Sequence, residues 1–237
     1  MFPVHYLNNS NSTMDDVFSF INKNVTALAV YTFDQRQGRG QYGNKWQSPS
    51  GEYLAYSLAI KTSEIELSGS LFNYRTATII RDFVANLTKT EVQIKWPNDI
   101  IIKNKKVSGI LIEKSKHLEH DYYVIGVGIN LLQTQFEHLP KAGSLLTQTG
   151  LKMDLEEFTQ DFHKTITEQI FIKKNDDEIL NNYNAHLYRS NIISVFEIGE
   201  MRQNGIIKSA DENGFLWVDL ENDGLQKFYH KEIQLLY

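Results

Sequence analysis

The 237-residue sequence predicts an α+β fold in two parts, a larger domain over residues 1–189 and a small all-β domain over residues 190–237. In the first part, segments with the helical spacing of apolar residues alternate with short β-rich runs. After Arg189 the helical spacing ends, and strand-like pieces follow one another with glycine-containing turns at short intervals, as in small β-barrels. We therefore place the boundary between Tyr188 and Asn191.

The N-terminal segments predict a helix and two strands around a long polar interval. Ser12 and Thr13 precede a run with acidic residues in its first turn, which is typical of a capped helix start. Residues 34–51 are polar and glycine-rich and show no apolar period, so we expect a long loop of the kind that carries function or is disordered. We expect strands at residues 27–33 and 52–60 and a helix at residues 70–87.

The segments that follow predict a group of antiparallel strands and then two helices. The β-rich runs are joined by short polar turns, which favour antiparallel pairing. Apolar residues at helical spacing begin at Leu155 and again at Ile179. The expected strands cover residues 92–95, 100–102, 107–113 and 122–129.

Composition excludes several classes of function. The chain has no cysteine, so it has no disulfide, thiolate metal site or Cys nucleophile. Its 24 Lys and Arg against 29 Asp and Glu give a formal charge of −5 without blocks of like charge, which argues against binding a nucleic-acid backbone. We find no secretory signal pattern and no apolar run long enough for a membrane span, so we expect a cytoplasmic protein without membrane attachment.

Part of the long loop, Gly38 to Gly43, has the G-x-G-x-x-G spacing of dinucleotide-binding folds. We reject that interpretation, because residues 44–51 cannot readily begin the helix whose N-terminus would receive the pyrophosphate. Gly38, Arg39, Gly40 and Trp46 instead suit a loop that folds over an anionic ligand and offers backbone N–H groups, a guanidinium and an aromatic cover. A mobile surface loop without a special role is the alternative.

A second cluster, Lys95-Trp96-Pro97-Asn98-Asp99, occupies a turn between two predicted strands. Lys95 can neutralise a carboxylate or α-phosphate as it becomes a mixed anhydride, and Asp99 can hold Mg²⁺ or orient an incoming amine. Gly126 and Gly128 end an apolar strand, where the lack of side chains lets a ligand lie against the backbone. The alternatives are a polar turn with its Trp in the core, and a β-bulge.

Taken together and in this order, these segments resemble the catalytic core of biotin protein ligases. The resemblance covers the first two thirds of the chain and implies a mixed β-sheet packed with helices, similar to class II synthetases, followed by an SH3-like β-barrel. It also implies an ATP-dependent enzyme that converts biotin to biotinyl-5'-AMP and transfers biotin to a lysine of a biotin carboxyl carrier protein, with Mg²⁺ as the ion. The segments that carry it are Ser12-Thr13, Gly38 to Gly40, Trp46 to Pro49, Lys95 to Asp99, Lys106 with Gly109 to Leu111, and Gly126 to Asn130.

Position by position, the resemblance implies a role for each of these side chains. Ser12, Thr13 and Gln35 hold the polar ureido end of biotin. A ligand without such a group would leave these side chains without hydrogen-bond partners and would therefore bind poorly. Trp46 closes over the adenylate, and Asn130 belongs to the nucleotide and Mg²⁺ side, while metal ligands are left unassigned. The implied catalytic residues are Arg39, Lys95, Asp99 and Lys106. The implied ligand-binding residues are Ser12, Thr13, Gln35, Gly38, Arg39, Gly40, Trp46, Lys106, Gly109, Gly126, Gly128 and Asn130.

Some positions depart from the family pattern. Gln41 and Tyr42 stand where many relatives have arginines, and Met14 stands where asparagine is usual. No aromatic residue lies near residues 142–145, where some relatives place one over adenine, and Leu236 stands where some carry an arginine. The sequence therefore leaves the adenine contacts unassigned.

Two other functions remain as alternatives. The first is a lipoate ligase, against which the Lys95 to Asp99 string and the C-terminal barrel favour biotin. The second is a non-catalytic biotin sensor or peptide-binding module, which would not need Arg39, Lys95, Asp99 and Lys106 together. Because the chain begins almost directly with the core segments, we expect no N-terminal DNA-binding domain and no DNA binding, and a homodimer is compatible with the sequence.

Overall fold

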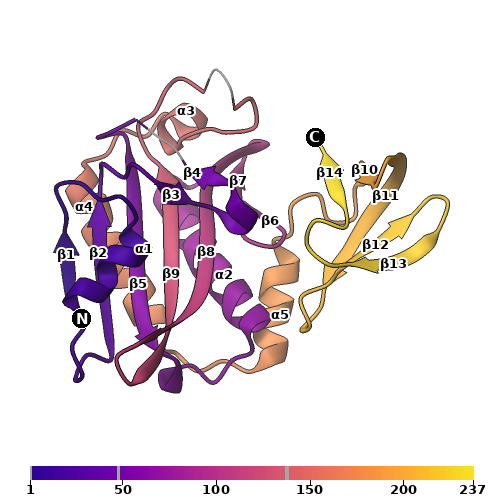
Figure 1. Ribbon diagram of the computed structural model, residues 1–237. Coiled ribbons are helices and arrows are strands. Elements are labelled where there is room, and N and C mark those ends of the chain that lie inside the picture. The colour runs from indigo at the N-terminus through magenta and orange to yellow at the C-terminus, as the bar shows by residue number, and fades with distance from the viewer. Residues whose placement is uncertain (1, 47–48, 137–138) are drawn as a thin grey trace.

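The computed structural model describes residues 2–46, 49–136 and 139–237, so Gln47 and Ser48 of the resemblance lie outside the described residues. The chain forms a larger N-terminal body around one sheet and a smaller C-terminal part around another (Figure 1). The strand order is β1-β2-β5-β9-β8-β7-β6 in the larger sheet and β13-β12-β11-β10-β14 in the smaller one. The predicted α+β class is confirmed.

The larger sheet is mixed, as expected. β1 and β2 are parallel, and all other neighbouring strands are antiparallel. The short β1, at the edge of the sheet, was not predicted. The strands are β1 (Val4–Tyr6), β2 (Ala27–Thr32), β5 (Tyr53–Lys61), β6 (Gln93–Lys95), β7 (Asp99–Ile102), β8 (Lys105–His117) and β9 (His120–Asn130).

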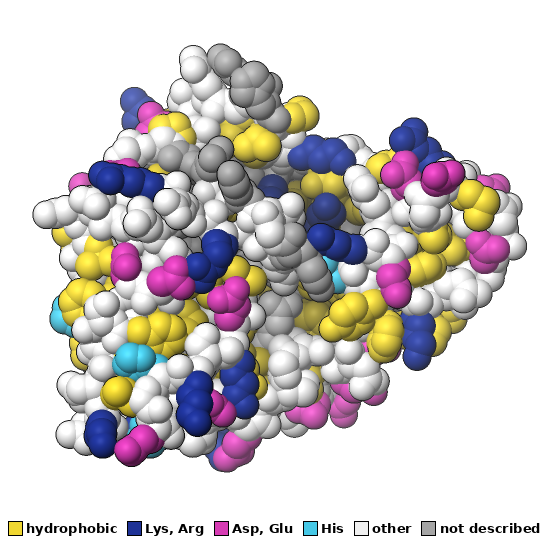
Figure 2. All heavy atoms as spheres, in the orientation of Figure 1, with side chains coloured by type: hydrophobic (Ala, Val, Ile, Leu, Met, Phe, Trp, Pro, Cys, Tyr) yellow, Lys and Arg dark blue, Asp and Glu magenta, His cyan; other side chains and the backbone are white. Residues whose placement is uncertain are grey.

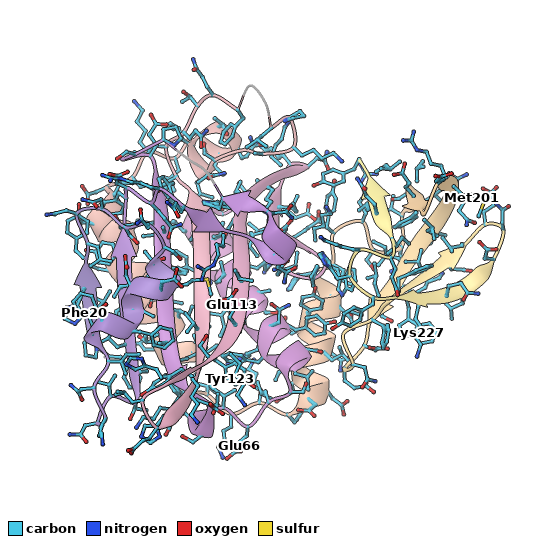
Figure 3. All side chains as sticks on the ribbon, viewed as in Figure 1. Phe20, Glu66, Glu113, Tyr123, Met201 and Lys227 are labelled. Atoms are coloured by element: carbon cyan, nitrogen blue, oxygen red, sulfur yellow. The ribbon has the colours of Figure 1, made fainter. Side chains whose placement is uncertain are left out.

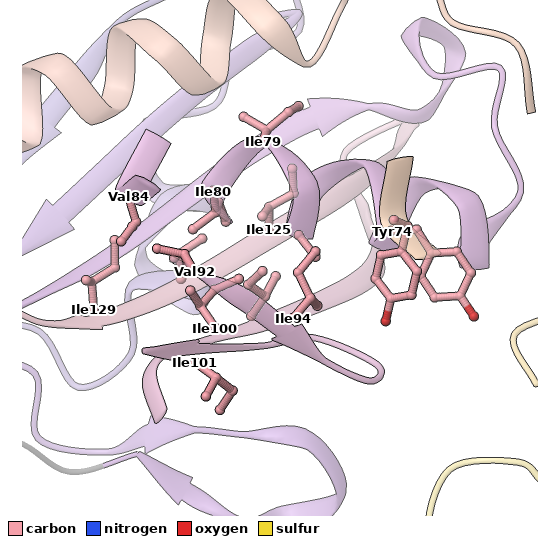
Figure 4. Packing of buried hydrophobic residues seen from close by; sticks show 14 of the residues in the cluster. Tyr74, Ile79, Ile80, Val84, Val92, Ile94, Ile100, Ile101, Ile125 and Ile129 are labelled. Carbon is pink, nitrogen blue, oxygen red and sulfur yellow. The ribbon is translucent and has the colours of Figure 1, made fainter. Parts of the chain in front are cut away.

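Three helices, α2 (Gly69–Thr88), α4 (Leu155–Gln169) and α5 (Asp176–Ala185), lie behind the sheet in Figure 1, and α1 (Thr13–Asp16) crosses its front. Helix α2 begins where the Ser68 side chain accepts a hydrogen bond from the backbone N–H of Leu71, and it ends at Lys89 in the left-handed conformation. Figure 4 shows the apolar core between α2 and the sheet. Ile80 and Val84 are fully buried there, and each such side chain contributes about 1.5 to 3 kcal/mol.

Two N-terminal expectations need correction. Ser12 is at the N-cap position of α1, but its side chain makes no capping bond to the backbone; it interacts with the carboxylate of Asp15 instead. The helix is also short and continues as a 3₁₀ turn over Val17–Phe20. The interval 34–51, expected as a loop without regular structure, contains a small hairpin of β3 (Gly38–Arg39) and β4 (Lys45–Trp46) around a 3₁₀ turn at Gln41–Gly43.

One further helix, α3 (Leu145–Thr149), was also missed. Its capping box uses Ser144 and Thr147, a pairing of two hydroxyls rather than the usual hydroxyl and carboxylate. None of the helices in the described part of the chain is long and apolar enough to cross a membrane.

The C-terminal part is an antiparallel sheet, as expected. Leu216, Val218 and Leu220 alternate with more exposed residues and face the core. Within residues 190–237, all of them described, the hydrogen-bonded strand order starts at β13 and stops at β14 without closing into a barrel. The exact domain boundary stays a prediction. The strands are β10 (Ile193–Ile198), β11 (Met201–Ala210), β12 (Leu216–Leu220), β13 (Gly224–Phe228) and β14 (Gln234–Leu236).

Candidate ligand-binding site

A cavity of about 160 Å³ lies between α1, the β3–β4 hairpin and the sheet. All of the residues predicted for the site line it except Gly38 and Asn130. These residues come from segments separated by up to about half of the chain, and the pairing of β5, β9, β8 and β7 brings them together. We refer to this space as the first cavity.

The end of the first cavity near α1 is polar and buried. The backbone N–H and the hydroxyl of Thr13 both donate to Gln35 Oε1, at 2.8 and 3.1 Å. Ser57, which sequence reasoning missed, donates its hydroxyl to Thr13 Oγ1 at 2.8 Å. Gln35 is held in turn by Tyr53, whose hydroxyl donates to the Gln35 carbonyl at 3.0 Å. The network is therefore preorganised, as a site that recognises a small polar group requires.

Glycines form the floor of the first cavity, and side chains of the protein itself cover them. A Cβ on Gly128 would lie 2.4 Å from Trp46 Cε2, and one on Gly126 would lie 2.6 Å from Met14 Sδ. The indole of Trp46 and the thioether of Met14 thus rest directly on the backbone. Trp46 Nε1 is buried without a hydrogen-bond partner among the described residues, a cost of about 1 to 3 kcal/mol that an acceptor on a ligand would relieve.

Gly38 has a structural role in the hairpin. A Cβ there would lie 2.6 Å from both Gln35 Nε2 and the Trp46 carbonyl oxygen, so a larger residue would separate β3 from β4. Gly38 thus serves the hairpin, although it does not line the first cavity.

Arg39 is tied to carboxylates at the rim of the first cavity. Its guanidinium donates to both oxygens of Asp15, at 2.6 and 2.9 Å, and lies 3.6 Å from Glu113 of β8, which is labelled in Figure 3. The bond to Arg39 holds the pKa of Asp15 below its usual value. Neither acid was predicted, and an anionic ligand would have to compete with them for Arg39.

Lysines and one aspartate form the opposite end of the first cavity. Lys106 Nζ lies 2.6 Å from Asp99 Oδ1, and Asp99 in turn pairs with Lys95 in the β6–β7 register. Burial lowers the pKa of Lys95, Asp99 opposes that shift, and the neighbouring charges of Lys106 and Lys141 add to it. The turn between β6 and β7 is fixed because the Pro97 carbonyl accepts from Asn73 Nδ2 at 3.1 Å and from the Tyr183 hydroxyl at 2.9 Å.

A second cavity, of about 410 Å³, adjoins the first and shares Trp46, Lys95, Asp99 and Lys106 with it. Asn130 lines this space, and its Nδ2 donates to the Gly143 carbonyl at 3.0 Å. Lys and Arg side chains gather at the hollow between the two sheets (Figure 2). The remaining lining residues, none of them predicted, are Phe136, Leu139, Pro140, Lys141, Ala142 and Tyr237.

These missed residues gave no local signal in the sequence. Lys141 lies in a polar connection, and Tyr237 reaches the second cavity only because β14 pairs with β10 at the edge of the smaller sheet. Phe136 and Tyr237 supply the aromatic surface that the sequence lacks near residues 142–145.

Comparisons with known proteins agree with this geometry. Residues 6–130 match the biotin/lipoate A/B protein ligase family. The biotin protein ligase of Aquifex aeolicus in complex with biotin and ATP has 25% sequence identity and a TM-score of 0.81, over 100% of this chain and 99% of that one. The biotin–[acetyl-CoA-carboxylase] ligase of Mycobacterium tuberculosis is 25% identical over 83% of this chain and 74% of its own length.

The bifunctional ligase/repressor BirA of Escherichia coli is 26% identical over 62% of this chain, and the matched region spans 46% of that protein. The match thus covers about half the length of this relative. The family match covers residues 6–130, more than half of the 237 residues, so the chain belongs to the biotin/lipoate A/B protein ligase family.

Proposed function

We propose that the chain is an ATP-dependent biotin protein ligase, which makes biotinyl-5'-AMP and transfers biotin to a lysine of a biotin carboxyl carrier protein. One observation carries the proposal: a buried polar network at Thr13 and Gln35 is joined by a glycine floor to a lysine-rich end at Lys95 and Lys106. Biotin has the matching form, a neutral polar ring system with a carboxylate at the end of an apolar chain. The names of the relatives support the same ligand.

In the first step, an oxygen of the biotin carboxylate attacks the α-phosphorus of ATP, and the bond to the pyrophosphate leaving group breaks. Two anions meet in this reaction, so the site must lower their repulsion. Lys106 and Lys95 are at the end of the cavity where the carboxylate would lie. Asp99 holds the Lys106 ammonium in position through the contact at 2.6 Å.

In the second step, the amine of the carrier lysine attacks the acyl carbon of the adenylate, and AMP leaves with the electrons of the broken C–O bond. The lysine must lose a proton first, and Asp99 is the carboxylate that we assign to orient its ammonium. Trp46 of the β3–β4 hairpin covers the glycine floor and would keep water from the reactive anhydride. Arg39 would move from Asp15 to the phosphate of the adenylate.

The donor set fits a magnesium ion that arrives with the nucleotide. Among the described residues lining the two cavities, Asp99 is the one with a side-chain carboxylate, and no cluster of three or more His, Cys, Asp or Glu able to hold a metal occurs in the described ranges. Mg²⁺ in nucleotide sites is commonly held by one or two carboxylates and by phosphate oxygens. Asp99 would supply the protein ligand during the first step, before the carrier lysine enters, and the ion would shield the phosphate charge.

We also propose a cytoplasmic location and no DNA-binding role, the latter supported by the net charge of −5. A homodimer remains compatible with this function, and light scattering at the assay concentration would detect it.

The test uses the purified chain with ATP, Mg²⁺, a carrier domain, and either biotin or lipoate. We expect biotin-dependent release of pyrophosphate and a mass increase of the carrier equal to one biotinyl group. The family includes lipoate ligases by name, so lipoate is the matched comparison. Lipoyl transfer without biotinyl transfer would assign the other substrate, and pyrophosphate release that ignores biotin would reject the adenylation step.

A further inference from the structure

The second cavity has the chemistry of a site for an aromatic polyanion. Lys95, Lys106 and Lys141 contribute ammonium groups to it, against the single side-chain carboxylate of Asp99. Phe136 and other apolar residues form the rest of the wall, and the volume of about 410 Å³ falls within the range of small-molecule sites, roughly 300–1,000 Å³. A nucleoside triphosphate carries both the negative charge and the aromatic base that such walls complement.

Tyr237 is the point where the smaller sheet reaches this cavity. Its ring centroid lies 4.3 Å from Lys141 Nζ and 5.0 Å from Lys95 Nζ, both within the range of cation–π attraction. The ring is held from the side by Tyr188, whose centroid is 5.1 Å away at an interplanar angle of 68°. Tyr188 is fixed in turn because its hydroxyl donates to Asn104 Oδ1 at 2.7 Å.

The phenol of Tyr237 is neutral at physiological pH, because burial raises its pKa to about 12. The attraction to the two lysines therefore comes from the face of the ring rather than from a phenolate charge. This distinction matters for the test, because a phenylalanine keeps the face and a leucine does not.

We propose that Tyr237 is a positioning residue for the nucleotide: its ring holds the ammonium groups of Lys95 and Lys141 where the triphosphate of ATP binds. The inference rests on the proposed function, since it assigns the second cavity to that substrate. Lysine side chains have many rotamers, and three like charges close together favour conformations that spread into solvent. A ring that keeps two of these lysine side chains in place lowers the entropy that they lose when ATP binds.

The experiment compares Tyr237→Leu, Tyr237→Phe and the control Tyr229→Leu in the full chain. Tyr229 is an exposed aromatic residue of the same C-terminal part that packs on Phe215 and lines neither cavity. With Tyr237→Leu we expect the KM for ATP to rise roughly five- to thirty-fold, while the KM for biotin changes less than about twofold. Tyr237→Phe and Tyr229→Leu should both remain close to the wild type.

Calorimetric titration with a non-hydrolysable ATP analogue, without biotin, provides a readout that does not depend on turnover. Lys141→Met removes one of the two ammonium groups without touching the smaller sheet and should weaken the same binding even where Tyr237→Leu does not fold. Unchanged analogue affinity in Lys141→Met, or an equal loss in Tyr237→Phe and Tyr237→Leu, would overturn the assignment. A wild type that binds the analogue but never transfers biotin would reject the proposed function. The analogue affinities of the Tyr237 and Lys141 variants would then still decide whether Tyr237 positions the lysines for the nucleotide.

Discussion

Single charged side chains of the site are held by partners of opposite charge. Lys106 pairs with Asp99 at 2.6 Å, and Arg39 makes a bidentate contact with Asp15. Removing a cation from water costs less free energy when a carboxylate accompanies it. The pairs thus keep the cations in the site without a ligand, and under the proposed function the reacting anions would add to the contacts of Lys106. Lys106 lines both cavities, whereas Arg39 lines only the first.

We expect Lys106→Ala to slow adenylate formation by about 2 to 4 kcal/mol in activation free energy, because it removes a charge-assisted contact to a developing anion. Biotin-dependent pyrophosphate release measures this step. Lys114→Ala is the control, since Lys114 is on the same strand and pairs with Asp121 at 3.3 Å outside both cavities. Equal rates in Lys106→Ala and Lys114→Ala would contradict the role of Lys106.

A buried histidine behind the first cavity predicts a pH dependence of stability. His163 Nδ1 bonds to the hydroxyl of Tyr56, which lines the cavity, and its Nε2 bonds to the Phe2 carbonyl, both at 2.8 Å. Burial lowers the pKa of His163 below 6.5, and the bond to Phe2 opposes this shift. The unfolded chain therefore takes up a proton at a higher pH than the folded chain does, and stability falls as the pH drops below 6.5.

We expect the unfolding temperature of the wild type to decrease between about pH 7 and pH 5, and His163→Gln to show a shallower decrease. Glutamine retains hydrogen-bonding groups but does not titrate. His186 and His230 also have lowered pKa values, mainly through burial, so the variant should keep part of the slope. Differential scanning calorimetry at several pH values gives the slope for each protein. Equal slopes for the wild type and His163→Gln would mean that His163 does not cause the loss of stability at low pH.

Among the elements, the β3–β4 hairpin is the one that covers the glycine floor of the first cavity. Two residue pairs join its strands, Gly38 with Trp46 and Arg39 with Lys45. The Trp46 indole anchors it on the glycine floor, which the lack of side chains at Gly109 and Gly128 permits, and Arg39 ties it to Asp15. Glycine-rich segments gain more conformational entropy on opening than others do. The hairpin should therefore open more easily than the sheet beneath it.

We expect amide exchange over residues 38–46 to slow on binding of a non-hydrolysable biotinyl-adenylate analogue, since ordering costs roughly 1 to 2 kcal/mol per residue and ligand contacts must offset it. Gly128→Ala should speed exchange of the free protein, because the new Cβ would lie 2.4 Å from Trp46. Gly69→Ala is the control, since a Cβ there meets nothing within 4 Å. Equal protection with and without the analogue would mean that the hairpin is preformed.

The sequence predicted the longer elements from local patterns, and the resemblance to a known family implied about half of the residues that line the first cavity. Short β-rich runs marked β5 and β9, and helical spacing marked α2, each within a few residues of the observed ends. It missed β1 and α3, which are too short to show a period and depend on neighbours for their stability. It also missed Lys141 and Tyr237, whose place in the site depends on how the two sheets pack together rather than on any motif.

At the scale of the whole molecule, the two sheets share one apolar core. A single cluster of buried residues contains Ile94 and Leu187 of the body together with Phe196, Val218 and Leu235 of the smaller sheet. The second cavity lies where the two parts meet, so their docking also sets the position of Tyr237.

Helix α5 of the larger body is hydrogen-bonded to the smaller sheet through Asn184. This contact allows a test of whether the two parts unfold together. Asn184 donates from Nδ2 to the Ala210 carbonyl at 3.0 Å and accepts from the Ala210 N–H at 2.7 Å, so one side chain satisfies both backbone groups at the end of β11. We expect the wild type to unfold in one calorimetric transition.

Asn184→Ala should lower the free energy of unfolding by about 1 to 3 kcal/mol, because two partly buried backbone groups lose their partner. Asn181→Ala, an exposed change on the same helix, controls for helix propensity and should be neutral or slightly stabilising. Two separate transitions in the wild type would show that the sheets fold independently.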